Sequence, residues 1–154
     1  MAEPATDLMG QVARLDPKSA ARQLIDARKQ HRGWLDEFSE QLDRQRNAAA
    51  LERVLAVWGL NQSDAARIFG VSRQAISKWL AQGVPAERAE AIADIAAATD
   101  LLVHHLTRDR IPAVVRRRAA ALGECSLLAM LERQSFREVL EACRAMFAFG
   151  EALR

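Results

Sequence analysis

Apolar residues recur along this chain at the spacing of an α-helix. In the segment 48–58 the apolar stripe consists of Leu51, Val54, Leu55 and Trp58, which follow the i, i+3, i+4, i+7 rule. Comparable stripes run through residues 92–106 and 136–147. No segment alternates apolar and polar residues between hairpin turns in the manner of a strand. The pattern therefore predicts an all-α fold.

The N-terminal third predicts a helical arm. Asp16-Pro17 suits a helix start, and we expect that helix to reach about residue 31. Gly33 then favours a break before a second helix over 34–46, and a third helix follows over 48–58. Two interpretations of this arm stay open. It is either a solvated arm or an element for dimerisation or partner docking.

The segment 60–84 predicts two short helices joined by a tight turn. Asn61 can cap the first helix, and Gly70 suits the positive φ of the turn. Ser72 can cap the second helix, and Gly83 ends it. Two helices joined in this way have the geometry of a DNA-reading helix-turn-helix unit.

The inner side of this pair is apolar at the positions that such a unit requires. The small or apolar residues assigned to the inner side are Ala66, Val71, Ile76, Trp79 and Leu80. Ala66 allows the helices to cross closely, while Val71 and Ile76 fill the angle between them. This packing leaves the opposite face of the second helix free to enter a major groove.

That outer face carries side chains suited to DNA. Arginine can bind guanine through two hydrogen bonds, and glutamine can bind adenine in the same way. Free N–H groups at the start of a helix favour a phosphate. The predicted DNA-binding residues are Gln62, Ser63, Arg67, Ser72, Arg73, Gln74, Ser77 and Lys78. An ordinary helical hairpin with a solvated polar face is the alternative.

Composition and charge narrow the function classes. Half of the 154 residues are hydrophobic, so a packed core is expected, and the net charge is only +2. No apolar run is long enough to span a membrane, and Met1 to Thr6 do not resemble a secretory signal. The two cysteines, Cys125 and Cys143, indicate neither a disulfide framework nor a metal site. These features favour a cytoplasmic protein.

Nothing in the sequence predicts catalysis, a metal or a cofactor. Adjacent His104 and His105 point about 100° apart on a helix, so they would not converge on one ion. Cys143 lies on an apolar stripe and is interpreted as a core residue. No nucleophile has a base beside it, and no glycine loop could hold a phosphate. The basic run Arg116-Arg117-Arg118 is interpreted as a solvated face, with a second DNA phosphate contact as the alternative.

The run NQSDAARIFGVSRQAISKWLAQG, residues 61–83, resembles the helix-turn-helix of Xre-type regulators, the phage-repressor (Cro/C1) class. The residues that match the pattern of that family are Gln62, Ala66, Gly70, Ile76 and Trp79. The resemblance implies that Gln62 holds a phosphate and that Arg73, Gln74 and Ser77 face base edges.

After the helical stripe of residues 92–106 come the motifs Ile111-Pro112, Ala121-Leu122-Gly123, Leu127-Leu128-Ala129-Met130-Leu131 and Arg137-Glu138-Val139-Leu140. This order resembles that of Xre-type antitoxins that carry a C-terminal toxin-binding domain and are encoded beside RES-domain toxins. Together with the helix-turn-helix, the resemblance covers roughly residues 48–150. The resemblance implies a C-terminal segment that blocks the NAD-consuming site of the toxin. The residues assigned to that contact are Met146, Phe147, Phe149, Leu153 and Arg154. Closure of the core by the last helix, with a frayed tail, is the alternative.

Together these features predict three parts: a helical arm over 1–46, a helix-turn-helix core over 47–107 and a toxin-binding module over 108–154. The predicted function is an antitoxin that binds its toxin and represses its own operon at a palindromic operator, as a homodimer or within a toxin complex. A stand-alone regulator whose C-terminal helices only dimerise is the alternative. A pure interaction adaptor without DNA binding is the third hypothesis.

Overall fold

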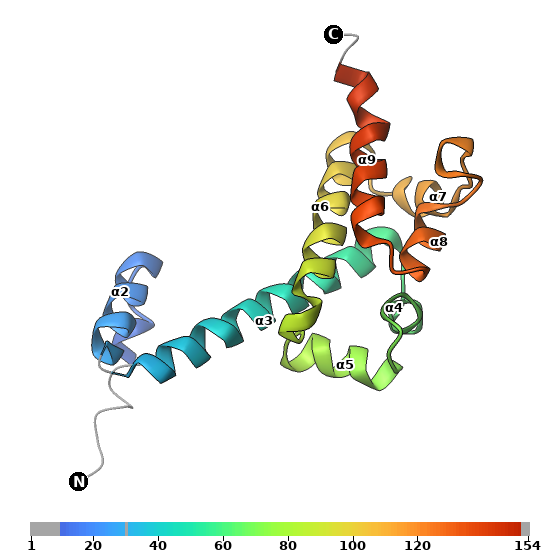
Figure 1. The fold of residues 1–154 in the computed structure, drawn as a ribbon. Coiled ribbons are helices and arrows are strands. Elements are labelled where there is room, and N and C mark those ends of the chain that lie inside the picture. The colour runs from blue at the N-terminus through green and yellow to red at the C-terminus, as the bar shows by residue number, and fades with distance from the viewer. Residues whose placement is uncertain (1–9, 30, 152–154) are drawn as a thin grey trace. The chain divides into compact units, whose positions relative to one another are not determined.

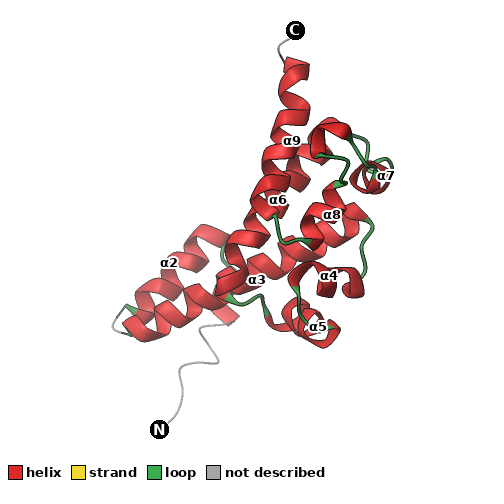
Figure 2. Cartoon of the chain, turned by 45° about the vertical axis from the view of Figure 1, so that its right-hand side comes forward, coloured by secondary structure: helices red, strands yellow, loops and turns green. Residues whose placement is uncertain are grey.

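The computed structural model describes the backbone of residues 10–29 and 31–151 and the side chains of those residues as far as 148. This part of the chain is helical and contains no strand (Figure 1, Figure 2). One isolated bridge pairs Ala119 with Cys125. The predicted all-α fold is therefore confirmed.

The helices follow one another with short connections. In chain order they are α2 (Pro17–Arg28), α3 (Arg32–Trp58), α4 (Gln62–Phe69), α5 (Arg73–Gln82), the 3-10 turn η1 (Ala86–Arg88), α6 (Ala89–His105), α7 (Ile111–Arg116), the 3-10 turn η2 (Ala120–Leu122), α8 (Leu127–Glu132) and α9 (Phe136–Glu151). None of the described helices is long and apolar enough to cross a membrane.

The chain divides into two compact units, residues 1–42 and 43–154. The first boundary lies four residues before the predicted one. The predicted parts 47–107 and 108–154 both lie in the second unit, because α6 and α9 pack side by side and share one core.

One predicted helix boundary is wrong. The segments 34–46 and 48–58 form the single helix α3, because no proline or glycine separates them. The expected break between the first two helices is present, since α2 ends at Arg28 and α3 begins at Arg32, but Gly33 itself lies in the first turn of α3. After Pro85 the chain first forms the 3-10 turn η1, and α6 begins at Ala89.

The core of the second unit is mainly apolar and contains a buried hydrogen-bonded chain. Trp58, at the end of α3, donates its indole N–H to the hydroxyl of Thr99 at 2.8 Å. Thr99 in turn donates to the carbonyl of Ile95 at 2.7 Å. The ring of Phe69 packs between those of Trp79 and Phe136. These contacts join α3, α4, α5, α6 and α9 into one body that carries the predicted DNA-reading pair.

Candidate nucleic-acid interface

The start of α4 is fixed by reciprocal hydrogen bonds between Asn61 and Asp64. The side chain of Asn61 accepts from the Asp64 N–H, and the Asp64 carboxylate accepts from the Asn61 N–H, both at 2.9 Å. The predicted cap at Asn61 is thus confirmed. The hydrogen bond from the Asn61 N–H is the main cause that lowers the pKa of Asp64, and the guanidinium of Arg67 adds to it.

The turn between α4 and α5 has the predicted glycine corner. Gly70 takes a left-handed conformation with φ of 63°, and its N–H bonds to carbonyls of the last turn of α4. Val71 also closes the corner, because its N–H donates to the Ala66 carbonyl at 3.0 Å. The hydroxyl of Ser72 caps α5 by accepting from the Ala75 N–H at 3.1 Å. Because the Ser72 hydroxyl acts as the acceptor in this cap, it can still donate its proton to an outside group.

The back of α5 is packed against the protein. Ile76 is fully buried and Trp79 is 7% exposed, as the sequence predicts. At the end of α5, the Val84 N–H donates to the Arg44 carbonyl in α3 at 3.0 Å. Gly83 has a φ of 109°, and a Cβ there would lie 2.8 Å from the Cβ of Arg44. Gly83 therefore lets α5 end directly against α3, a role that the sequence alone did not reveal.

The front of α5 is exposed. The side chains of Arg73, Gln74, Ser77 and Lys78 all face solvent. Within the part of the chain that the structure describes, no ion pair or hydrogen bond holds the charged ends of Arg73 and Lys78. We call these four residues the α5 ridge. The structure thus brings four of the eight predicted DNA-binding residues together on one accessible surface.

The first turn of α4 offers less to a phosphate than the sequence suggests. Gln62 is half-buried and Ser63 is exposed, and their backbone N–H groups begin the helix. The Asp64 carboxylate already occupies this turn, and its lowered pKa keeps it negative at neutral pH. A phosphate here would approach the N–H groups of Gln62 and Ser63 against that charge.

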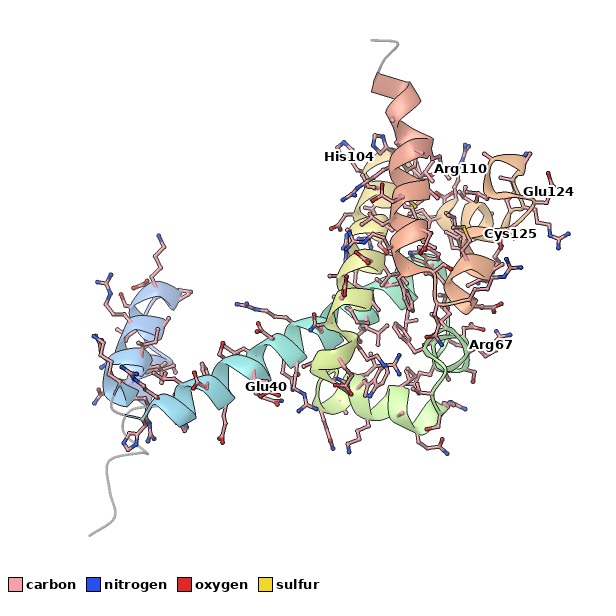
Figure 3. All side chains as sticks on the ribbon, in the orientation of Figure 1. Glu40, Arg67, His104, Arg110, Glu124 and Cys125 are labelled. Atoms are coloured by element: carbon pink, nitrogen blue, oxygen red, sulfur yellow. The ribbon has the colours of Figure 1, made fainter. Side chains whose placement is uncertain are left out.

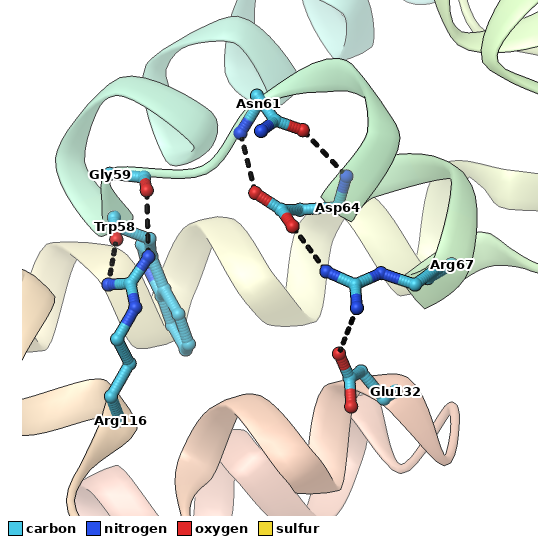
Figure 4. A network of polar contacts seen from close by, with 7 residues as sticks. All are labelled: Trp58, Gly59, Asn61, Asp64, Arg67, Arg116 and Glu132. Carbon is cyan, nitrogen blue, oxygen red and sulfur yellow. Dashed lines mark hydrogen bonds and ion pairs between the residues drawn. The ribbon is translucent and has the colours of Figure 1, made fainter.

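Arg67 has a role within the fold. Its guanidinium pairs with Asp64 of the same helix and with Glu132 of α8, the second contact at 3.8 Å (Figure 4). The contact with Glu132 links Arg67 to α8. The predicted DNA-backbone contact of Arg67 would therefore compete with ion pairs that the protein makes itself.

Arg116 has a structural role that the sequence analysis missed. Its guanidinium donates to the carbonyl of Trp58 at 3.0 Å and to that of Gly59 at 2.8 Å, and so caps the end of α3 (Figure 4). It also donates to the Pro112 carbonyl at 2.8 Å. The neighbours Arg117 and Arg118 are exposed. Only a contact between segments about sixty residues apart distinguishes Arg116 from them.

The predicted toxin-binding residues are only partly described. Met146 is 41% exposed and lines a groove of 520 Å³. The other residues around this groove are Val114, Arg117, Arg118, Ala119, Ala120, Ala121, Leu122 and Leu127. Phe147 is half-buried and stacks on His105, with ring centroids 4.2 Å apart. The side chain of Phe149, and Leu153 and Arg154 entirely, lie outside the described residues.

The remaining titratable groups show no assembled site. Among the described residues, no group of three histidine, cysteine, aspartate or glutamate side chains could hold a metal ion. Burial raises the pKa of Cys143 to about 11, so its thiol stays protonated at neutral pH. His104 meets His105 edge to face, and both lie at the end of α6 (Figure 3).

Neither the comparison with models of protein families nor the comparison with curated proteins finds a match.

Proposed function

We propose that the protein binds double-stranded DNA and that α5 is the helix that reads the major groove. The observation that carries this proposal is the α5 ridge, a set of exposed polar and cationic side chains whose charged ends have no partner among the described residues. Behind the ridge, Ile76 and Trp79 fix the orientation of the helix. A fixed back and an unengaged front are what a recognition helix needs.

Different residues of the α5 ridge would select the base sequence and add affinity for DNA. Arg73 and Gln74 lie in the first turn of α5, the part of a recognition helix that meets base edges. Their side chains can bind guanine and adenine with two hydrogen bonds each. Lys78 lies more than a turn further on and suits a phosphate, which adds affinity without sequence preference.

Two copies of the chain, each placing α5 in one half-site, would bind a palindromic operator. Two recognition helices related by a twofold axis enter successive major grooves about 34–36 Å apart. An isolated half-site contact by one short helix would bind weakly and depend strongly on salt. Repression of its own operon by a dimer is therefore the form of DNA binding that we propose.

The proposed biological role is that of a cytoplasmic antitoxin, which rests on the resemblance of the C-terminal sequence to antitoxins that act with RES-domain toxins. The groove beside Met146 supplies an apolar surface with Arg117 and Arg118 around it, which suits an apolar segment that carries acidic residues. The C-terminal end of α9 and α5 lie at opposite ends of the second unit in Figures 1 and 2. Toxin and DNA would thus not compete for one surface.

Selection from random DNA tests the DNA-binding proposal. The full chain should enrich a palindromic sequence. Arg73→Ala should then reduce discrimination at one base position by roughly 1–3 kcal/mol. Lys78→Ala should weaken binding to all sequences alike and lower the salt dependence. Failure of the full chain to enrich any sequence would leave the adaptor hypothesis.

Co-expression with the protein of the adjacent gene tests the antitoxin role. Rescue of growth and co-purification are expected. Met146→Asp should weaken both and leave operator binding unchanged, and Ala148→Asp, at an exposed position outside the groove, is the control. Operator binding without any rescue would instead support the stand-alone regulator.

A further inference from the structure

The first unit exposes an apolar face. α2 and the Arg32–Leu42 part of α3 flank a groove of 360 Å³. The groove is lined by Pro17, Ala20, Ala21, Leu24, Ile25, Trp34, Leu35, Phe38 and Leu42. Ile25 is 48% exposed and Phe38 is 40% exposed. No described residue between 10 and 42 is fully buried, so this unit has no core of its own.

A helical segment this short needs an additional source of stability. The first unit spans residues 1–42, close to the size of about 40 residues below which disulfides, metals or oligomerisation are usually needed. Both cysteines of the chain, Cys125 and Cys143, lie in the second unit. The described residues of the first unit contain no cluster that could hold a metal ion. Association through the apolar face would supply such stability by burying these exposed side chains.

The charges of the first unit indicate what associates with it. α2 has a net charge of +2, from three cations less one anion: Lys18, Arg22 and Arg28 against Asp26. The Arg32–Leu42 part of α3 has a net charge of −2, from one cation less three anions: Arg32 against Asp36, Glu37 and Glu40. In a twofold pair, α2 of each copy can lie beside α3 of the other. The surface is then complementary to itself in charge as well as apolar in its centre.

We propose that the apolar face of the first unit is a homodimer interface and that its occupant is the same face of a second copy. Two such helix pairs form a four-helix bundle, in which Leu24, Ile25, Phe38 and Leu42 become core residues. The opposite charges of the two helices set the orientation of the copies. The dimer supplies the twofold symmetry that a palindromic operator would require.

This inference does not depend on DNA binding, and its test is made without DNA. Sedimentation of the full chain over a range of concentrations should show a monomer–dimer equilibrium. Phe38→Glu should raise the dimer dissociation constant at least tenfold, because a carboxylate would be buried in the bundle. Ser39→Glu, at the next exposed position outside the groove, should leave the constant unchanged.

Reversing the charges of α2 or of α3 gives a second test of the dimer, which remains usable if Phe38→Glu disturbs the helices. Lys18→Glu with Arg22→Glu makes α2 acidic, and Glu37→Lys with Glu40→Lys makes the facing part of α3 basic. Each double variant alone should dimerise more weakly than the natural chain. A mixture of the two should form a heterodimer, since both intermolecular contacts then pair opposite charges.

A full chain that stays monomeric at every concentration, or double variants that fail to pair on mixing, would overturn the inference. The first result would assign the apolar face to a different protein. A dimer that Phe38→Glu and Ser39→Glu leave equally intact would place the interface elsewhere. Each of these results is independent of whether the chain binds DNA.

Discussion

The back and the front of the α4–α5 pair differ in how far the protein constrains them. On the back, Ile76 has no exposed surface and Gly83 fits against Arg44. On the front, Arg73 and Lys78 have no partner within the described part of the chain. The back therefore determines stability and orientation, whereas the front is available to a ligand. Substitutions on the two sides should separate these two properties.

The arginines show the same contrast. Arg67 and Arg116 lie close to the pair in sequence or in space, yet internal carbonyls and carboxylates engage both of them. Arg73 is also an arginine, but it has no such contact within the described part of the chain. A basic side chain near the pair is thus not necessarily a DNA contact. Its hydrogen bonds and ion pairs within the protein distinguish a structural arginine from one that is available to DNA.

The largest expected effect is on the buried side of α5. Ile76→Ala should lower the free energy of unfolding by about 2–5 kcal/mol, because it removes a fully buried side chain and leaves a cavity. The adjacent exposed residue gives the control: Ser77→Ala should change it by less than about 0.5 kcal/mol. Urea denaturation followed by tryptophan fluorescence measures both, and equal effects would contradict the contrast.

The contact of Gly83 with α3 should give the next effect. Gly83→Ala introduces strain at a φ of 109° and a clash with the Arg44 Cβ, and should cost more than Gly123→Ala. Gly123 also has a positive φ, of 65°, but has open space around it, so only the backbone cost of roughly 1–2 kcal/mol applies. Thermal or urea unfolding compares the two variants. A smaller loss of unfolding free energy in Gly83→Ala than in Gly123→Ala would show that α3 shifts to accommodate the added Cβ.

Removal of the Arg116 side chain should cost about 1–3 kcal/mol, because three hydrogen bonds from a charged donor are lost at the junction of α3 and α7. Arg117→Ala removes the same charge from an exposed neighbour and should have almost no effect on the free energy of unfolding. If the two variants unfold at the same urea concentration, the proposed cap of α3 is wrong.

The smallest effect concerns pH. The pKa of Asp64 is lowered in the folded protein, so its ionised form adds stability above the unfolded pKa of about 3.8, and this stability is lost as the pH falls through the lower folded value. Asp64→Asn should therefore flatten the acid side of the stability profile. Asp109→Asn, at an exposed position, should leave the profile unchanged. Unfolding midpoints between neutral and acid pH test this prediction.

The sequence predicts local features of the pair well because neighbouring residues determine them. Asn61 and Ser72 cap their helices, and Gly70 takes the left-handed conformation, as expected. The apolar spacing also predicts the burial of Ile76 and Trp79. Caps, turns and faces are set within one or two helical turns, so a single sequence contains the information.

Features that depend on distant contacts could not be predicted in this way. The guanidinium of Arg116 reaches the end of α3, and Gly83 meets Arg44, across dozens of residues. The sequence prediction divided α3 between the segments 34–46 and 48–58, although no proline or glycine lies between them. The spacing of apolar residues along the sequence likewise does not show which surface packs on the apolar face around Phe38.

The salt dependence of DNA affinity tests the central claim about the α5 ridge most directly. The full chain should be titrated with its selected operator at several salt concentrations, beside the double variants Arg73→Ala/Lys78→Ala and Arg117→Ala/Arg118→Ala. The ridge variant should bind more weakly and with a shallower salt slope, since cationic contacts to DNA release counterions. The second variant should match the natural chain. If both double variants bind like the natural chain, or if only the second loses affinity, α5 is not the DNA-reading helix.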